Sequence, residues 1–444
     1  MNNITKMNQE DISSKAVKVK SKWMQRIVNF LMVMGPGLIV MEADNDAGAV
    51  STYMQAGANY GTHLMWVLLL LLPITYFIQE MIVRLGIATG QGHAALIYKR
   101  FGKWWGAFSL GDLMIVNFLT IVTEFAAISL ALQAFGLEPL YSVPVAALAL
   151  VTLVLTGSYL RWERTVIILC FMDLAWFCLV YFSSPEWGTV LQHTVVPTLA
   201  DGPITSDLIF LIIAIVGTTI APWQLFFQQS CIADKRLRFS DIKTAQMDTF
   251  LGACFTILVA AAMMLVGDYS NSFGIKFEDP AQMALAIAPF AGEMFKNAIL
   301  LLMINAAVLG ATAVSLSSAW AWGEVKGWEN SLQKSAKEAP SFYATYVLCI
   351  LAAAGVVLIP DAPLQTIILS VQVLAGLMLP SAIIFLQLLL NDKELLGERF
   401  ANKRWNNWIN WTIVAILFVL SLALAVQVIL PDFFNDFGLF TTDG

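Results

Sequence analysis

Three acidic residues stand close together in an apolar stretch near the start of the chain. Glu42, Asp44 and Asp46 lie within the run 27–58, which contains no Lys or Arg. A carboxylate near the centre of a lipid bilayer is costly unless it is paired, and a bound cation is the simplest partner. Asp46 is the favoured ligand, because Gly48 follows it and permits an unwound backbone with free carbonyl oxygens. For Glu42 and Asp44 a second interpretation stays open, in which they pair with other helices or accept hydrogen bonds from Ser, Thr or Gln.

A second interruption occurs in the sixth apolar run along the chain. Pro222 has no N–H and removes one helical hydrogen bond, which frees the backbone near Thr218. Gln224 and Gln228 follow with neutral amide groups, and Gln372 lies in a later apolar run. Thr218, Gln224 and Gln372 are therefore candidate oxygen ligands. The alternative is that the proline only kinks its helix and that each glutamine joins two helices.

The residue types at both interruptions predict a site made of hard oxygen ligands. Segments 43–49 and 217–224 contain no histidine, methionine or cysteine. Carboxylate, carbonyl and water oxygens suit Mg²⁺, Ca²⁺ and Mn²⁺. Mg²⁺ gives up its waters reluctantly and usually contacts only one or two carboxylates. The small residues Ala47, Ala49 and Ala221 would leave room for the waters that remain on the ion.

Other charged residues also fall inside apolar runs. Glu80 and Arg84 are spaced i,i+4 on one predicted helix, so we expect them to pair with each other. Glu124 is in the middle of its run and has no partner on its own helix. It could be a proton relay, a station on the cation path or a protonated structural carboxyl.

The sequence shows no sign of catalysis or of nucleotide binding. It has no P-loop and no Ser/His/Asp arrangement. Its five cysteines lack the CxxC spacing of a zinc or redox site and are expected to pack in apolar helices. We therefore expect a protein that is not an enzyme, carries no cofactor, binds no nucleic acid and needs no obligatory protein partner.

The elements that position these residues are predicted to be membrane-spanning helices. Of the 444 residues, 58% are hydrophobic and only 13% are charged, a composition that suits a lipid bilayer as the surrounding solvent. A spanning helix needs about 20 apolar residues. Eleven runs qualify: 27–58, 64–88, 107–134, 142–158, 164–183, 207–231, 243–267, 296–323, 341–358, 364–391 and 408–430. Two connections are longer than the others: 184–206 is expected to hold a surface turn or short strand, and 268–295 a short amphipathic helix.

The positions of the basic residues support this count and give an orientation. With the N-terminus inside, 23 of the 25 Lys and Arg residues fall in cytoplasmic segments, and only Lys276 and Lys296 fall outside. We expect a cytoplasmic tail over 1–26, a single transporter domain over 27–430 and a short external tail over 431–444. The predicted location is the plasma membrane of a prokaryote.

The interrupted runs are the first and the sixth of the eleven. They begin two groups of five runs, and because five is odd the second group must be inverted relative to the first. Interrupted helices at matching positions of inverted repeats are typical of a transporter with a binding site at the middle of the membrane.

Particular motifs now identify a resemblance to the Nramp family of divalent-metal transporters. The similar segments are Gly35-Pro36-Gly37, Gln55-Ala56-Gly57-Ala58, Leu85-Gly86-Ile87-Ala88-Thr89-Gly90, Glu124-Phe125-Ala126-Ala127-Ile128, and Gln372 with Pro380. The resemblance extends over nearly the whole chain. It implies an all-α integral membrane protein of the LeuT-type fold, with ten core helices as inverted repeats, an eleventh helix added, and helices 1 and 6 broken at the midplane.

The chain departs from the family pattern at the expected ligands. The family's Asp-Pro-Gly-Asn reads Asp46-Ala47-Gly48-Ala49 here, and its Met-Pro-His reads Ala221-Pro222-Trp223. A second family histidine is matched by Gln228, and a third-span aspartate by Ile121. This pattern resembles a branch of the family, the prokaryotic Nramp-related magnesium transporters, which carry hydrated Mg²⁺ and also Mn²⁺ and are not thought to couple transport to protons.

The resemblance and the residue types together predict a carrier for hydrated Mg²⁺, and also for Mn²⁺, that works by alternating access without proton coupling. Asp46, Thr218, Gln224 and Gln372 would hold the ion. The cavity would be shaped by Ala49, Ala221 and Trp223, with Glu42, Asp44, Glu124 and Gln228 behind the ligands or along the cation path. The alternatives are a proton-coupled Mn²⁺/Fe²⁺ transporter of the usual Nramp type and an organic-solute symporter of the same fold.

Overall fold

The computed structural model describes residues 35–155, 157–198 and 205–429, and every regular element within them is a helix. The expected tails 1–26 and 431–444 lie outside the described residues. In chain order the helices are α3 (Pro36–Glu42), α4 (Ala47–Tyr60), α5 (Met65–Thr89), α6 (His93–Ala134), α7 (Pro139–Val154), α8 (Tyr159–Met172), α9 (Ala175–Ser183), α10 (Trp187–Val195), α11 (Ser206–Thr219), α12 (Pro222–Lys235), the short 3₁₀ helix η1 (Phe239–Asp241), α13 (Ile242–Asn271), α14 (Pro280–Ala291), α15 (Glu293–Lys326), α16 (Pro340–Val357), α17 (Leu364–Leu390), α18 (Lys393–Phe400) and α19 (Arg404–Ile429).

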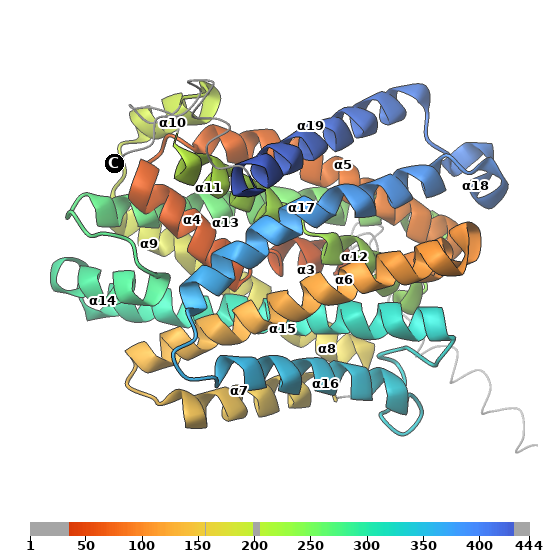
Figure 1. The fold of residues 1–444 in the computed structure, drawn as a ribbon, viewed down its shortest axis with the longest axis horizontal. Helices are drawn as coiled ribbons and strands as arrows, with labels where there is room; N and C mark the ends of the chain where they lie inside the picture. Colours follow the sequence, from red (N-terminus) through yellow and green to blue (C-terminus); the bar gives the residue numbers. More distant parts are fainter. Residues whose placement is uncertain (1–34, 156, 199–204, 430–444) are drawn as a thin grey trace, which may run out of the picture.

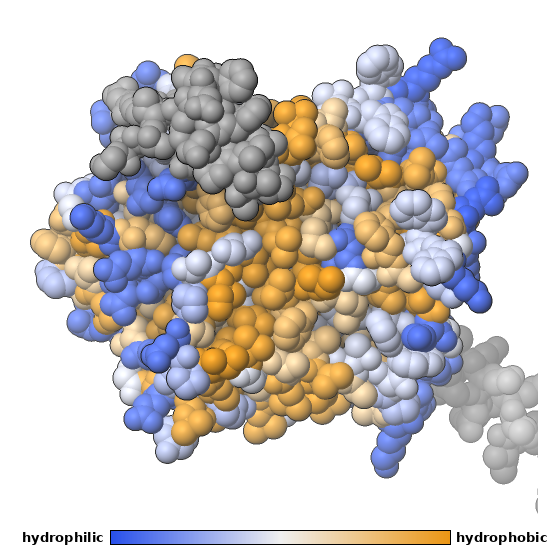
Figure 2. Space-filling view, viewed as in Figure 1, coloured by the Kyte–Doolittle hydropathy of each residue, from blue (hydrophilic) through white to orange (hydrophobic). Residues whose placement is uncertain are grey.

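Nine helical segments in the described parts of the chain are long and apolar enough to cross a membrane. This number counts α8 with α9 as one segment and α11 with α12 as another. The segments match nine of the expected spans. Of the other two, the first corresponds to the broken pair α3 and α4, and the fourth to α7, which is 16 residues long. Figure 2 shows a broad hydrophobic zone across the middle of the molecule, with hydrophilic residues gathered at its two ends. This distribution is that of a protein surrounded by lipid at its waist.

The long helices run roughly parallel between these two ends, and the broken pair α3 and α4 lies among them (Figure 1). Helix α13 packs along both α3 and α4, while α15 packs along α6. Helix α17 contacts α11, α4 and α6. The two interruptions therefore lie inside a bundle, where other helices can supply partners for the freed backbone groups.

The connection 184–206 differs from the sequence-based expectation. In place of a turn or short strand it contains helix α10. Its large exposed apolar residues, Trp187, Leu191 and Val195, recur every four positions, which is the helical period, while Val190 is buried on another face. This pattern and packing against α5 account for a helix in place of the expected turn or strand. The helix expected in 268–295 is confirmed as α14.

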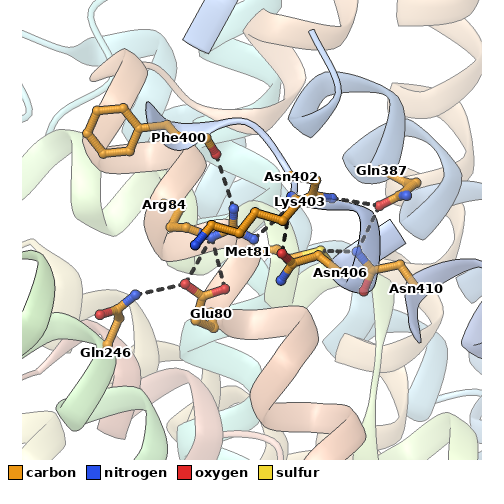
Figure 3. A network of polar contacts seen from close by, with 10 residues as sticks. All are labelled: Glu80, Met81, Arg84, Gln246, Gln387, Phe400, Asn402, Lys403, Asn406 and Asn410. Atoms are coloured by element: carbon orange, nitrogen blue, oxygen red, sulfur yellow. Dashed lines mark hydrogen bonds and ion pairs between the residues drawn. The ribbon is translucent and has the colours of Figure 1, made fainter. Parts of the chain in front are cut away.

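One end of the bundle is fastened by a polar network centred on Arg84 of α5 (Figure 3). Its Nε donates to Glu80 at 2.9 Å, which confirms the expected pair. Its two terminal nitrogens donate to the carbonyl of Phe400 at 3.1 Å and to Asn402 Oδ1 at 2.9 Å. Gln246 of α13 donates to the second oxygen of Glu80 at 2.7 Å. Arg84 thus joins α5 to the end of α18 and to the segment that follows it. Glu80 joins α5 to α13.

Arg84→Met should lower the thermal stability of the purified protein. The substitution keeps the apolar stem but removes all three contacts, and charge-assisted hydrogen bonds are worth about 1.5–3 kcal/mol each when partly buried. We expect a lower midpoint of thermal unfolding in detergent, measured by intrinsic fluorescence. Lys393→Met, at an exposed position on α18, serves as the charge-matched control and should leave the midpoint unchanged. Equal midpoints for both variants would contradict a stabilising role for the network.

Candidate functional site

The first break separates α3 from α4 at residues 43–46. Asp46 is the N-cap of α4, and its Oδ1 accepts a hydrogen bond from the Ala49 N–H at 2.9 Å. The side chain is 3% exposed. Aspartate is a favoured N-cap, because its carboxylate satisfies N–H groups that have no partner within the helix. The predicted ligand therefore lies at the break, on the positive end of a helix dipole.

A second carboxyl group meets the same helix start. Glu124 Oε2 of α6 accepts from the Ala47 N–H at 3.1 Å, and the Glu124 carboxyl contacts that of Asp46. Glu124 Oε1 has no hydrogen-bond partner among the described residues, and the side chain is fully buried. The structure thus brings Glu124 to the side of Asp46, which the sequence alone left open.

The approach of these two carboxyls depends on Gly310 in α15. A Cβ atom at this position would lie 2.7 Å from Asp46 Cβ and 2.8 Å from Glu124 Cδ. Both distances are far inside van der Waals contact, so any larger residue would displace one of the two acids. Sequence reasoning missed Gly310 because a single glycine in a long apolar helix gives no local signal.

The second break lies between α11 and α12, with Ile220 and Ala221 outside both helices. Since Pro222 has no N–H, the carbonyl of Thr218 cannot receive the usual i+4 hydrogen bond. Thr218 Oγ1 also lacks a partner in the described chain, and the residue is 2% exposed. Thr218 thus has a hydroxyl oxygen without a described partner, and its role as a ligand stays a prediction.

A side-chain hydrogen bond joins the two interrupted helices. Tyr53 of α4 and Thr219 at the end of α11 place their hydroxyl oxygens 2.7 Å apart. Both residues are fully buried. This bond joins the middle of α4 to the C-terminal end of α11, so the two interrupted helices are neighbours. Neither residue was among the candidates from sequence, since a buried tyrosine or threonine usually has a packing role.

Helix α17 closes over both breaks through Gln372. A Cβ atom at Gly48 would overlap the Gln372 amide, and one at Gly217 would overlap the Gln372 carbonyl oxygen. The Gln372 Nε2 atom has no acceptor within the described residues. Because the oxygen and nitrogen of an amide occupy similar positions, rotation of this group can present the oxygen instead. Gln372 thus lies against the backbone of both interrupted helices, at Gly48 and at Gly217.

The two other glutamines have partners of their own. Gln224 Oε1 accepts from Gln79 Nε2 of α5 at 2.8 Å, so its oxygen is occupied in this conformation. Gln228 Nε2 donates to Thr249 Oγ1 of α13 at 2.9 Å, which leaves Gln228 Oε1 without a partner among the described residues. Gln79 was missed in the sequence, because one amide in an apolar run resembles an ordinary contact between helices.

The remaining acids of the first break face different surroundings. Both oxygens of Asp44 lack a well-formed hydrogen bond to any described residue, although the side chain lies next to Gln224. Glu42 is bonded instead to Asn45, whose Nδ2 donates to its Oε1 at 3.2 Å. Asp44 therefore keeps both oxygens without a described hydrogen bond, whereas Glu42 is bonded to Asn45.

The first half-helix, α3, is also capped by an acid from elsewhere in the chain. Asp248 of α13 accepts from the N–H groups of Gly35, Gly37 and Leu38 at 3.1, 2.8 and 3.3 Å. The side chain is buried in the bundle. This contact spans more than 200 residues along the chain and could not be predicted from the sequence.

The described residues contain no group of three or more His, Cys, Asp or Glu side chains placed to hold a metal ion together. A cation at the breaks would instead meet one or two carboxylates, the oxygens of Thr218 and an amide. The small residues Ala49 and Ala221 border the breaks and are buried, as is Trp223, whose indole N–H has no partner within the described chain. This donor set suits an ion that keeps part of its hydration shell.

The sequence of this chain is similar to those of known transporters. The sequence profile of the Nramp family, "Natural resistance-associated macrophage protein-like", matches residues 37–427. This chain belongs to the Nramp family. The "Divalent metal cation transporter MntH" of Staphylococcus aureus strains JH9 and Newman is 26% identical, over 96% of this chain and 98% of the relative.

Solved structures agree with the fold of this Nramp protein. An Eremococcus coleocola manganese transporter superposes with a TM-score of 0.74 at 19% identity, covering 95% of this chain and 91% of that one. Mhp1, a nucleobase-cation-symport-1 family transporter in a closed conformation, gives a TM-score of 0.52 at 14% identity, over 92% of this chain and 94% of that one. At these identities the likeness concerns the fold alone.

Gly310→Ala should impair the site while leaving the fold intact. The added methyl group would push Asp46 or Glu124 away from the start of α4, and overpacking of this kind costs about 1–3 kcal/mol. We expect at least a tenfold loss of divalent-cation binding, measured by isothermal titration calorimetry. Gly355→Ala on α16 is the matched control, because a Cβ there meets nothing within 4 Å. Equal binding by both variants would show that the contact at Gly310 has no part in the site.

Proposed function

We propose that this Nramp protein is a secondary carrier that imports hydrated Mg²⁺, and also Mn²⁺, by alternating access without proton coupling. The observation that carries the proposal is the donor set at the two breaks. Carboxylate oxygens of Asp46 and Glu124 lie at the start of α4, and the hydroxyl and carbonyl oxygens of Thr218 lie at the end of α11. Segments 43–49 and 217–224 contain no sulfur or imidazole. Such ligands hold Mg²⁺ and Mn²⁺ but do not favour softer metals.

Asp46 supplies the negative charge that meets the ion, directly or through a water molecule. The oxygens of Thr218, Gln372 and Gln224 complete or orient the hydration shell, Gln224 after release from Gln79. Ala49, Ala221 and Trp223 set the width of the cavity. Asp44, like Glu124 and Gln228, has a role behind the ligands or along the path by which the cation reaches them.

The membrane potential supplies the driving force. Moving one charge across 100 mV is worth about 2.3 kcal/mol, so a divalent ion gains about twice that on entering a negatively charged cell interior. No histidine lies in the segments of either break to form a titratable chain there. This supports an uncoupled carrier. It belongs in the plasma membrane of a prokaryote, with the N-terminus in the cytoplasm and the C-terminus outside.

Two other functions fit less well. A proton-coupled Mn²⁺/Fe²⁺ importer shares the family, and MntH, the named relative, is a divalent metal cation transporter. An organic-solute symporter of the same fold would bind an anionic group at a free helix N-terminus. Here Asp46 and Glu124 already occupy the N-terminus of α4, which disfavours an anionic substrate.

Liposomes that contain the purified protein should take up Mg²⁺ in response to an inside-negative potential. Asp46→Ala should abolish uptake, because it removes the anionic ligand, and a Mg²⁺-sensitive dye inside the vesicles measures both rates. The internal pH should stay constant during uptake. Absence of Mg²⁺ uptake by the natural protein, or equal uptake by the Asp46 variant, would refute the proposal, and acidification with metal entry would favour the proton-coupled alternative.

The combined substitutions Ala49→Asn, Ala221→Met and Trp223→His should shift the preference from Mg²⁺ toward Mn²⁺. They introduce a softer thioether and an imidazole and reduce the space for coordinated waters. Competition of Mg²⁺ against Mn²⁺ uptake in the same vesicles gives the ratio, which should change at least tenfold. A triple variant with an unchanged ratio would place the selectivity outside these three positions.

A further inference from the structure

A second pair of buried carboxyl groups lies near the metal site without belonging to it. Glu42 is the last residue of α3, four positions before Asp46, and Asp173 lies at the junction between α8 and α9. Both side chains are 0% exposed. Their carboxyl groups lie within hydrogen-bonding reach of each other. Two ionised carboxylates could not form a hydrogen bond there, because neither has a proton to donate.

Each carboxyl of the pair receives one amide donor from an asparagine. Asn45 Nδ2 donates to Glu42 Oε1 at 3.2 Å and to the carbonyl of Thr256 at 3.2 Å. Asn305 Nδ2 of α15 donates to Asp173 Oδ1 at 3.0 Å and to the carbonyl of Leu169 at 3.1 Å. A backbone carbonyl can only accept, so each asparagine must direct its NH₂ group toward its carboxyl.

This arrangement leaves one oxygen on each carboxyl without an N–H donor. Glu42 Oε2 and Asp173 Oδ2 have no partner of conventional donor type among the described residues, and both are buried. A buried polar oxygen without a partner costs about 1–3 kcal/mol. A proton placed between these two oxygens would satisfy both at once.

The charged groups around the pair offer no other compensation. Asp44 from the linker, Cys170 from α8 and Asp248 from α13 are the titratable groups that act on this region, and none is cationic. Helix α12, which also packs on α3, brings Lys235, and this lysine is ion-paired with Glu163 at 2.6 Å.

Helix α15 contributes Asn305 to the pair, and its charged residues lie near its two ends. No metal-binding group of three or more ligating side chains occurs in the described parts of the chain. The amide N–H groups of Asn45 and Asn305 point at the carboxyls, where they would repel a cation.

We propose that Glu42 and Asp173 form a proton-binding site and share a single proton. With one proton, two of the four oxygens accept amide N–H groups and the other two share the O–H···O bond. With no proton, two like charges would be in contact at low dielectric. With two protons, one O–H group would lack an acceptor within the described residues.

The shared proton is a structural ligand of the broken first helix. It fastens the seven-residue α3 to the middle of the fifth span, and Asn305 fastens the same span to α15. In this proposal the proton is not cargo. The site therefore agrees with uncoupled transport but does not depend on it.

Infrared spectroscopy of the purified protein in lipid tests the proposal without any transport measurement. A protonated carboxyl gives a C=O stretching band that an ionised carboxylate lacks. Glu42→Gln should remove the intensity of one carboxyl from this band, because the glutamine amide donates to an ionised Asp173. Asp173→Asn should remove the same intensity for the reciprocal reason, and either variant suffices if the other fails to fold.

The double variant separates one shared proton from two independent protons. Glu42→Gln with Asp173→Asn should lose no more intensity than either single variant. A twofold loss would mean that both acids are protonated, and no loss in any variant would mean that both are ionised; either result would overturn the proposal. The lost band should also be insensitive to Mg²⁺, unlike any band from Asp46 or Glu124.

Glu163→Gln is the matched control. Glu163 is a carboxylate of the same span, 6% exposed in its side chain, and it is ion-paired with Lys235. It is therefore ionised, and its removal should leave the band of protonated carboxyls unchanged. If Glu163→Gln reduced the band as much as Glu42→Gln does, the assignment to the Glu42–Asp173 pair would be wrong.

Discussion

The structure depends on how the backbone groups freed by an interrupted helix find partners in an apolar bundle. A helix that starts in the middle of a membrane has N–H groups without intrahelical acceptors, and lipid offers none. Three acids solve this problem here. Asp248 accepts from three N–H groups at the start of α3, while Asp46 and Glu124 accept from two at the start of α4. The two acids that we propose as part of the metal site, Asp46 and Glu124, are thus also the caps that make the broken helix possible.

The second break has the opposite polarity, and this difference creates a site for a cation. At the end of α11 the free groups are carbonyl and hydroxyl oxygens, because Pro222 cannot donate to the turn before it. The Tyr53–Thr219 bond brings this oxygen-rich end to α4, whose start carries two carboxyls. A positive ion placed between them meets oxygen from both helices. Membership of the Nramp family agrees with this arrangement, since the profile match extends across both breaks.

The sequence predicted those features that a single segment carries. A proline within an apolar run, or an acid followed by glycine, changes the local backbone whatever surrounds it, so both breaks and Asp46 could be found. Residues that contact partners on other helices have no such signal in the sequence. Gly310 matters only because Asp46 and Glu124 approach it from two other helices, and Asp248 is separated from its partners by more than 200 residues. The helix α10 was missed although its exposed apolar residues recur with helical spacing.

Two carboxyl pairs within the same break show how neighbours decide what an acid does. Asp46 and Glu124 contact each other, but Glu124 Oε1 has no described partner, and neither does Thr218 Oγ1 at the end of α11. Around Glu42 and Asp173, two asparagine amides already direct N–H groups at the carboxyls. An incoming cation would gain from the first set of oxygens and be repelled by the amide hydrogens of the second. The same side-chain chemistry therefore leaves an oxygen without a described donor beside Asp46 and gives a proton-sharing contact at Glu42. The amide donors, which the sequence shows only as two scattered asparagines, make the difference.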